Sequence, residues 1–132
     1  MGKLKTVLLV DDDETTNFLN KFFLRQLDSN LEVNVAQNGK EAIDFLILNA
    51  DDITPCLIVL DTNMPVMNGW EFLTAYDKKI DEKIKKKIVV VMLTAVDTDV
   101  VVEKAMKDPN VSDTSQKPLS DLKFRALISK HF

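Results

Sequence analysis

Short runs of apolar residues alternate with segments of helical period along most of this chain. The clearest runs are residues 7–10, 56–60 and 88–93, and they are rich in valine, isoleucine and leucine. Runs of this length are typical of buried strands, and strands that alternate with helices form a parallel sheet with crossover helices on both faces. The alternation therefore predicts an α/β protein built from βα repeats.

Five such repeats are predicted along the chain. We expect strands at residues 5–10, 31–36, 56–60, 87–93 and 111–116, and helices at residues 14–27, 40–49, 70–81, 99–107 and 120–130. The strand at 111–116 is too polar to be covered on both faces, so it should lie at an edge of the sheet. Ser120 is the expected N-cap of the last helix.

Two segments carry more specific expectations about packing. The first helix should turn an apolar stripe toward the core, made of Phe18, Leu19, Phe22, Phe23 and Leu27. Residues 78–87 are rich in charge, and we interpret them as a solvated helix end rather than a site for phosphate or nucleic acid. The i,i+4 ion pairs predicted there are Asp81 with Lys85 and Glu82 with Lys86.

Size and composition are those of one ordinary globular domain spanning residues 1–132. The formal net charge of −4 offers no basic field for binding nucleic acid or an anionic membrane surface. No apolar stretch reaches the roughly 20 residues of a membrane span, and residues 1–5 leave no room for a signal peptide before the first strand. We therefore expect a cytoplasmic protein whose single cysteine, Cys56, is an inert buried thiol.

Four of the predicted strands lead into a chemically functional side chain. Residues 11–13 are all aspartates after the first strand, Asp61 follows the third, Thr94 follows the fourth, and Lys117 follows the fifth. In an open parallel sheet the carboxyl ends of the strands lie at one edge, and ligands bind in the crevice outside that edge. These side chains should therefore converge on one site.

The predicted site suits a magnesium ion and phosphoryl chemistry. Asp11, Asp12 and Asp61, with a backbone carbonyl from the turn after Asp61, form an all-oxygen set that Mg²⁺ prefers, and no cluster of histidine or cysteine argues for zinc. A carboxylate beside Mg²⁺ can accept a phosphoryl group when neighbouring groups stabilise the charge on its oxygens. Asp61 would be the acceptor, and Thr94 and Lys117 would provide that stabilisation.

Each of these residues also has a purely structural interpretation. The aspartates at 11–13 can cap the first helix, because acidic groups favour the positive end of a helix dipole. Thr94 can bond to backbone at its strand end, and Lys117 can be a surface lysine before a turn proline. The combination still favours function, since four strand ends must each carry the right group in the right order.

The combination resembles the response-regulator receiver domain of two-component signalling, over essentially the whole chain. The matching pieces are Val10-Asp11-Asp12, Leu60-Asp61-Thr62-Asn63-Met64-Pro65, Gly69, Leu93-Thr94-Ala95 and Lys117-Pro118. The resemblance implies a flavodoxin-like, doubly wound sheet of five parallel strands in the order 2-1-3-4-5, with five helices. Gly69 is expected to supply a backbone conformation that other residues avoid.

The resemblance also assigns the metal ligands and the phosphodonor. It implies that a sensor histidine kinase or a histidine phosphotransfer protein phosphorylates Asp61. Asp12, Asp61 and the backbone carbonyl of Asn63 would bind Mg²⁺ directly, and Asp11 would act through water. It implies further that Lys117, in a cis peptide with Pro118, pairs with the phosphoryl group.

One position departs from the family pattern in the switch that follows phosphorylation. Thr94 would move to bond the phosphoryl group, and the family usually places a tyrosine or phenylalanine three residues before the lysine to rotate with it. Here that position is Thr114. We expect phosphorylation still to reposition Thr94, and the signal to pass through the helix at 99–107 and the strand at 111–116 without a rotating ring.

Two further residues carry separate expectations. Val96 lies at a family position that tunes the loss of phosphate, and an apolar side chain cannot orient water for attack, so self-dephosphorylation should be slow. His131 lies one residue from the C-terminus and should be solvated, which makes it a poor phosphoacceptor.

Two other functions remain open from the sequence. A small phosphatase resembling the haloacid dehalogenase superfamily would use Asp11 and Asp13 as its Asp-x-Asp motif, but it leaves Asp61 unexplained. A pseudo-receiver that binds partners without phosphorylation is favoured slightly by Thr114. The leading interpretation is a non-enzymatic phosphoacceptor that acts on an unidentified downstream protein or relays phosphate to a histidine phosphotransfer domain.

Overall fold

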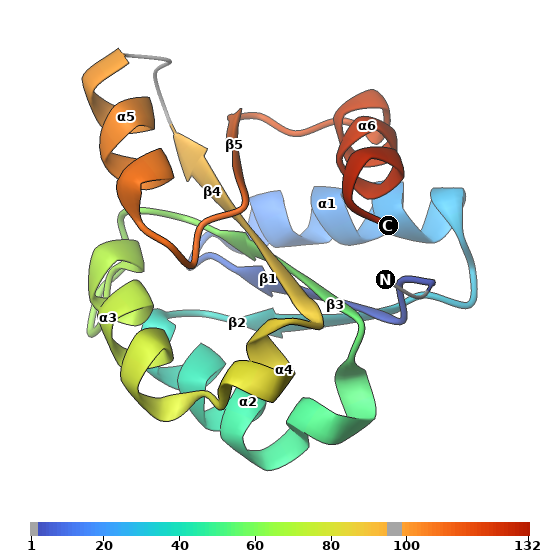
Figure 1. The fold of residues 1–132 in the computed structure, drawn as a ribbon. Helices are drawn as coiled ribbons and strands as arrows, with labels where there is room; N and C mark the ends of the chain where they lie inside the picture. Colours follow the sequence, from blue (N-terminus) through green and yellow to red (C-terminus); the bar gives the residue numbers. More distant parts are fainter. Residues whose placement is uncertain (1–2, 95–98) are drawn as a thin grey trace.

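A computed structural model describes residues 3–94 and 99–132 as a five-stranded sheet flanked by helices (Figure 1). The strands are β1 Thr6–Val10, β2 Glu32–Ala36, β3 Cys56–Leu60, β4 Ile88–Thr94 and β5 Asp113–Gln116. The helices are α1 Glu14–Leu27, α2 Gly39–Ile53, α3 Gly69–Lys79, α4 Glu82–Lys85, α5 Asp99–Lys107 and α6 Asp121–His131. The described residues thus contain six helices instead of the predicted five, because the chain leaves α3 at Ile80 and begins the one-turn helix α4 after it.

All strand pairs are parallel, and the strand order is β2-β1-β3-β4-β5. This order confirms the predicted flavodoxin-like sheet. Leu60 pairs with Val10 on one side and with Met92 on the other, so β1 and β3 end side by side and β4 continues two residues further. The chain segments that leave β1 and β3 therefore start from the same edge of the sheet.

Burial along the strands follows their position in the sheet. Every residue of the three central strands β1, β3 and β4 is buried, whereas the edge strands β2 and β5 alternate or stay partly exposed. Strands that are covered on both faces need apolar residues throughout, and an edge strand does not. The polar sequence of β5 is accommodated because β5 lies at the predicted edge.

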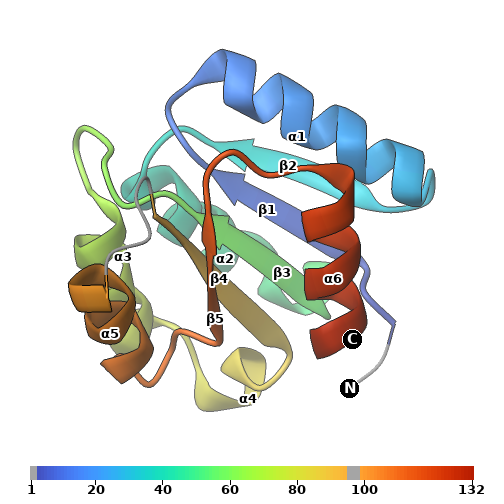
Figure 2. The ribbon, with the colours of Figure 1, turned by 90° about the horizontal axis from the view of Figure 1, so that it is seen from above.

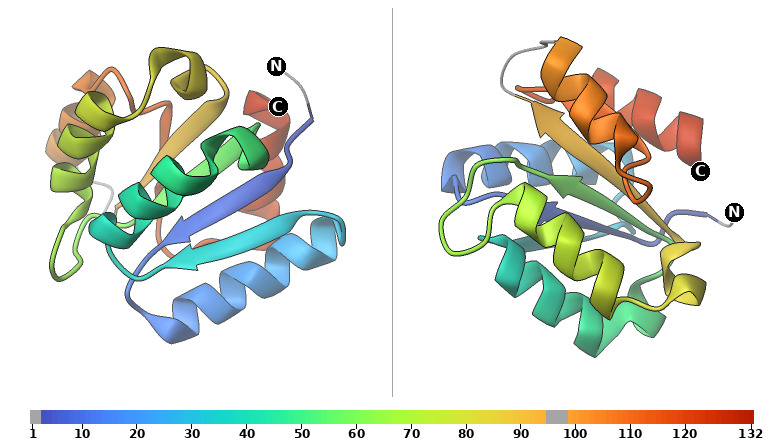
Figure 3. Two further views of the ribbon diagram at one scale, coloured as in Figure 1. Left: turned by 90° about the horizontal axis from the view of Figure 1, so that it is seen from below. Right: turned by 60° about the vertical axis from the view of Figure 1, so that its left-hand side comes forward.

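Helices cover both faces of the sheet, as Figures 1 and 2 show. Leu24 of α1 and Phe124 of α6 pack in the core on one face, while Leu46 of α2 and Phe72 of α3 pack in the core on the other. Figure 3 shows α2 and α3 side by side on the second face. In the part of the chain that the structure describes, no helix has the length and apolar character needed to cross a membrane.

The predicted apolar stripe of α1 is wrong in its orientation. Phe18 is 72% exposed, and Leu19 and Phe22 are also exposed, while the buried residues of α1 are Asn17, Asn20 and Leu24. Phe23 and Leu27 are partly buried against the core, so only the C-terminal part of the stripe faces as predicted. The side-chain amide of Asn17 donates to the carbonyl of Asp11 at 2.9 Å, a contact that accompanies the inward orientation of the asparagine face of α1.

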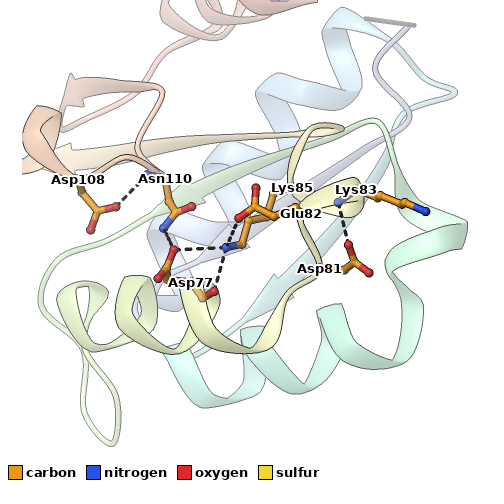
Figure 4. A network of polar contacts seen from close by, with 7 residues as sticks. All are labelled: Asp77, Asp81, Glu82, Lys83, Lys85, Asp108 and Asn110. Carbon is orange, nitrogen blue, oxygen red and sulfur yellow. Dashed lines mark hydrogen bonds and ion pairs between the residues drawn. The ribbon is translucent and has the colours of Figure 1, made fainter.

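The ion pairs predicted for residues 78–87 are replaced by a different network (Figure 4). Lys85 Nζ lies 3.3 Å from carboxylate oxygens of both Asp77 and Glu82, and Asn110 Nδ2 donates to Asp77 at 3.1 Å. The carboxylate of Asp81 instead caps α4. The backbone hydrogen bonds from Lys85 to Asp81 and from Lys86 to Glu82 are present, so the predicted i,i+4 spacing is kept. The predicted pairs do not form because the Asp81 carboxylate accepts the backbone N–H of Lys83 and the Lys85 side chain reaches back to Asp77.

His131 and Cys56 give opposite outcomes for two sequence predictions. The prediction of a solvated His131 is wrong: its side chain is 15% exposed, and its Nε2 lies 3.0 Å from the Asp113 carboxylate, which Lys130 also contacts. Burial alone would raise the pKa of Asp113, but hydrogen bonds from His131 and Lys130 hold this pKa below its ordinary value. Cys56 is fully buried, which raises its pKa to about 12 and confirms an inert thiol.

The orientation of α1 predicts contrasting effects of two truncations. Leu24→Ala should lower the free energy of unfolding by about 3 kcal/mol, because it removes a fully buried side chain from the core. Phe18→Ala should change it by no more than about 0.5 kcal/mol, because Phe18 is mostly exposed. Urea unfolding of both variants measures the difference, and a large loss for Phe18→Ala would contradict the observed orientation.

Candidate functional site

Three carboxylates gather where β1 and β3 end. The N–H of Asp11 donates to the carbonyl of Ala36 at 3.0 Å, and the N–H of Asp61 donates to the carbonyl of Val10 at 2.9 Å. These bonds continue the sheet ladder one residue past each strand and bring both aspartates to the same edge. One carboxylate oxygen from each of Asp11, Asp12 and Asp61 lies within 4.8 Å of the others. The predicted acidic cluster is therefore present.

Lys117 brings a positive charge to this cluster from the end of β5. Its Nζ lies 2.9 Å from Asp61 Oδ1 and 3.5 Å from Asp11 Oδ2. Its backbone N–H donates to the carbonyl of Thr94 at 2.9 Å, so the ends of β4 and β5 are joined beside the carboxylates. The Lys117-Pro118 peptide is cis, as the resemblance implies.

Burial and charge act on the titration of these groups in opposite directions. Burial raises the pKa of Asp11 above its ordinary value, and the negative charge of Asp61 adds to this effect, although a hydrogen bond from the backbone of Asp13 and the charge of Lys117 oppose it. Partial burial by itself lowers the pKa of Lys117, but its hydrogen bond to Asp61 and the two nearby carboxylates raise this pKa above its usual range. Lys117 is therefore charged at neutral pH.

Two buried polar atoms at this edge lack a hydrogen-bond partner among the described residues. They are Asp11 Oδ2, which has only the 3.5 Å ion-pair contact with Lys117, and the hydroxyl oxygen of Thr94; both residues are at least 96% buried. A buried polar atom without a partner is costly, and such atoms are informative at a functional site. A cation near the carboxylates and a phosphoryl group near Thr94 would supply the missing partners, so the residues present fit an Mg²⁺ site.

The capping interpretation of the three consecutive aspartates holds for only one of them. Asp13 is the N-cap of α1, and its carboxylate accepts hydrogen bonds from the backbone N–H of Thr15 and the hydroxyl of Thr16. Asp11 and Asp12 belong to the acidic cluster with Asp61, and Asp13 does not. The three aspartates therefore divide between a structural role and a site role.

Gly69 is needed at the site for a reason other than the predicted one. No described glycine has a positive φ, so a special backbone conformation does not explain Gly69. Instead, a Cβ at Gly69 would overlap the carbonyl oxygen of Asp61 and lie 3.0 Å from the Cα of Thr62. The N–H of Gly69 donates to the carbonyl of Thr62 at 3.0 Å. The start of α3 thus packs directly on the backbone that carries Asp61.

The structure places two more of the predicted site residues, Asn63 and Thr114, but it does not describe a third, Val96. Asn63 is exposed in the turn after β3, and the metal contact of its carbonyl remains a prediction. Thr114 lies in β5, pairs with Met92 of β4 and is partly buried, and its effect on the switch remains a prediction. Val96 lies outside the residues that the structure describes.

Two polar residues at the site were not identified from the sequence. The ammonium group of Lys123 in α6 donates to the carbonyls of Gln116 and Pro118 at 2.8 Å each. These two bonds hold the backbone on both sides of Lys117. Asn17 holds the carbonyl of Asp11 in the same way. A signal for Asn17 existed in the sequence, since an asparagine within the first helical turns after the aspartates is within reach of their backbone.

An open parallel sheet with a carboxylate cluster and a lysine outside its carboxyl edge defines an α/β protein with an acidic site that could hold a metal ion. The response regulator receiver domain family matches residues 7–129. The chain belongs to this family, which confirms the resemblance found in the sequence.

Individual relatives agree with the family. The chain is 34% identical over 96 residues to the nitrate/nitrite response regulator protein NarL of Escherichia coli K12, a match that covers 73% of this chain and 41% of that protein. It is 35% identical over 141 residues to hybrid signal transduction histidine kinase B of Dictyostelium discoideum, which covers 98% of this chain and 7% of the kinase. The chain therefore spans less than half the length of these two curated relatives.

A solved structure shows the same fold. The crystal structure of a two-component response regulator from Cytophaga hutchinsonii is 29% identical in sequence, with a TM-score of 0.83, and the match covers 98% of this chain and 97% of that one. The likeness extends over the whole sheet and its helices. The fold of the chain is thus that of a receiver domain.

The raised pKa of Asp11 predicts how the stability of the metal-free protein depends on pH. The pKa of Asp11 is higher in the folded state than in the unfolded state. As the pH rises from the unfolded-state pKa through the folded-state pKa, the carboxyl group loses its proton more readily in the unfolded state, and the folded state becomes less stable. Asp11→Asn should therefore raise the free energy of unfolding at pH 7 in a buffer without divalent ions. The gain should shrink as the pH falls through the raised pKa of folded Asp11 and should vanish below the ordinary value of 3.8, where Asp11 is protonated in both states.

Urea unfolding across this pH range measures the gain. Asp52→Asn serves as the matched control, because Asp52 is an exposed carboxylate near the end of α2 and should change stability by no more than about 0.5 kcal/mol. A stability gain for Asp11→Asn that is independent of pH, or a loss at pH 7, would contradict the electrostatic account of the cluster.

Proposed function

We propose that Asp61 accepts a phosphoryl group, with Mg²⁺, from a histidine kinase or a histidine phosphotransfer protein. The chain is a receiver domain of the response regulator family, which fits a role in a phosphorelay. The observation that carries the assignment to Asp61 is its position. It is the one carboxylate of the cluster that Lys117 contacts at 2.9 Å, and it is buried at the end of a central strand.

The reaction forms one bond and breaks another at phosphorus. A carboxylate oxygen of Asp61 attacks the phosphorus atom of a phosphohistidine, the phosphorus–nitrogen bond breaks, and the imidazole leaves with the bonding electron pair. Bound Mg²⁺ would neutralise negative charge on the phosphoryl oxygens and would be held by Asp12 and Asp61, with Asp11 nearby. The product is an aspartyl phosphate.

The other side chains of the site stabilise the charge that this transfer brings in. The ammonium group of Lys117, which already contacts the Asp61 carboxylate, is placed to pair with a phosphoryl oxygen. The unpartnered hydroxyl of Thr94 can donate to a second phosphoryl oxygen. Because Asp61 is itself the acceptor, the chain has no separate substrate, and its hydrolysis of the acyl phosphate would be self-directed.

The response to phosphorylation is proposed to run through Thr94 and the neighbouring edge strand. Thr94 ends β4, and its carbonyl accepts the backbone N–H of Lys117, so a movement of Thr94 acts directly on the end of β5. With Thr114 in place of an aromatic residue, the change reaches α5 and β5 without a rotating ring. A downstream protein, or a histidine phosphotransfer domain, would read this change.

The phosphatase alternative is less well supported by the geometry. Its Asp-x-Asp motif would need Asp13 at the reaction centre, whereas Asp13 caps α1 and lies outside the acidic cluster. The intact cluster with Lys117 also argues against a receiver that never takes up phosphate. We further propose that residues 1–132 act as one domain in the cytoplasm, without contact to nucleic acid or membrane.

Incubation with Mg²⁺ and phosphoramidate or acetyl phosphate, followed by intact-mass measurement, tests the proposed function. The wild-type protein should gain the mass of one phosphoryl group, and the gain should disappear in EDTA. Asp61→Asn should show no gain, because it lacks the acceptor carboxylate. Asp13→Asn is the matched control and should still be phosphorylated, because Asp13 is a helix cap.

Two outcomes would contradict this assignment. Phosphoryl uptake by Asp61→Asn at the wild-type rate would place the acceptor elsewhere. Hydrolysis of phosphate esters that survives Asp61→Asn but is lost in Asp11→Asn would favour the phosphatase alternative.

A further inference from the structure

The backbone turn that carries the acidic cluster is held by one side chain from α1. The carbonyl of Asp11 lies beyond the last residue of β1 and accepts the side-chain amide of Asn17 at 2.9 Å. The backbone N–H of Asn17 also donates to the carbonyl of Asp13 at 3.0 Å, where it forms the first turn of α1. Asn17 thus contacts the backbone on both sides of Asp12.

The amide of Asn17 is kept at a cost to the fold. Asn17 is 93% buried, and its Oδ1 has no hydrogen-bond partner among the described residues. A buried acceptor without a partner destabilises the fold relative to one that accepts a hydrogen bond. Rotating the amide would not relieve this cost, since it would point Oδ1 at the carbonyl oxygen of Asp11 and leave the N–H₂ group unpaired. An apolar residue would pack on the same helix face without this penalty.

The peptide that Asn17 holds sets the direction of Asp12. The carbonyl of Asp11 and the N–H of Asp12 belong to the same planar peptide unit, so fixing this carbonyl fixes the plane from which the Asp12 side chain projects. Asp12 is exposed, and among residues 3–94 and 99–132 no hydrogen bond or ion pair orients its carboxylate. Its placement near Asp11 and Asp61 therefore depends on the backbone beneath it.

We propose that Asn17 is a positioning residue for Mg²⁺ binding, which acts by fixing the Asp11–Asp12 peptide. This inference rests on the proposed function and deepens it. Groups that orient metal ligands from the layer behind them typically change metal affinity by about 10-fold to 100-fold when they are removed. The proposed role concerns only the affinity for Mg²⁺, so a change in this affinity can be measured without a phosphodonor.

Asn17→Leu is the principal test variant, and Asn20→Leu is its matched control. Asn20 lies one turn along on the same buried face of α1 and has the same side chain, but among the residues that the structure describes only the Asn17 side chain is hydrogen-bonded to the acidic turn from this face. In calorimetric titration with MgCl₂, Asn17→Leu should bind Mg²⁺ about tenfold more weakly than the wild type. Asn20→Leu should bind Mg²⁺ as the wild type does.

A second measurement separates positioning from a general loss of structure. Phosphorylation by phosphoramidate should require a higher Mg²⁺ concentration in Asn17→Leu, but at saturating Mg²⁺ its rate should return to the wild-type value. A merely structural role would lower the rate at every Mg²⁺ concentration and lower the urea midpoint instead. Asn17→Ala, which retains high helix propensity, replaces Asn17→Leu if leucine prevents folding, and it should show the same shift in Mg²⁺ requirement.

The outcomes distinguish this inference from the proposed function. If the wild type binds Mg²⁺ and is phosphorylated but Asn17→Leu and Asn17→Ala bind Mg²⁺ equally well, the positioning role is overturned and the proposed function stands. If the wild type neither binds Mg²⁺ nor takes up phosphate, the proposed function fails and this inference fails with it. An equal loss of affinity in Asn20→Leu would also overturn the positioning role.

Discussion

The mutual repulsion of three carboxylates at one edge of the sheet is the constraint on which the site depends. Oxygens of Asp11, Asp12 and Asp61 lie within 4.8 Å of one another, and two of these residues are buried. Like charges at this separation oppose one another strongly where water is excluded. Lys117 relieves part of this repulsion through its contact with Asp61. The remaining negative charge is what makes the edge suited to a divalent cation.

The surrounding fold holds these charges in place through backbone contacts. Gly69 lets the start of α3 pack on the backbone of Asp61, Lys123 fixes the carbonyls on both sides of Lys117, and Asn17 fixes the carbonyl of Asp11. Each contact comes from a different helix and reaches a different strand end. The helices therefore do more than cover the sheet, because they set the direction in which the reactive side chains project.

The sheet and the acidic cluster could be predicted from the sequence, because both follow from short-range rules. Apolar runs such as Cys56–Leu60 are sufficient to place a buried strand, and parallel topology then brings Asp61 to the same edge as Asp11. The family resemblance added the strand order and the role of Lys117.

The remaining features depend on tertiary contacts that periodicity does not record. The inward face of α1 was assigned to Phe18 and Phe22, but a single hydrogen bond from Asn17 to the backbone accompanies the opposite orientation. The division of the predicted third helix at Ile80 and the burial of His131 against Asp113 likewise depend on neighbouring elements. Hydrophobic periodicity carries no information about such polar contacts, so it could not predict these features.

A crystal structure of the wild-type protein grown with MgCl₂ tests the central claim most directly. The account predicts one ion in octahedral coordination, at about 2.1 Å from carboxylate oxygens of Asp12 and Asp61. Density at the strand ends that shows no ion at millimolar Mg²⁺, with the ion bound elsewhere or not at all, would contradict it.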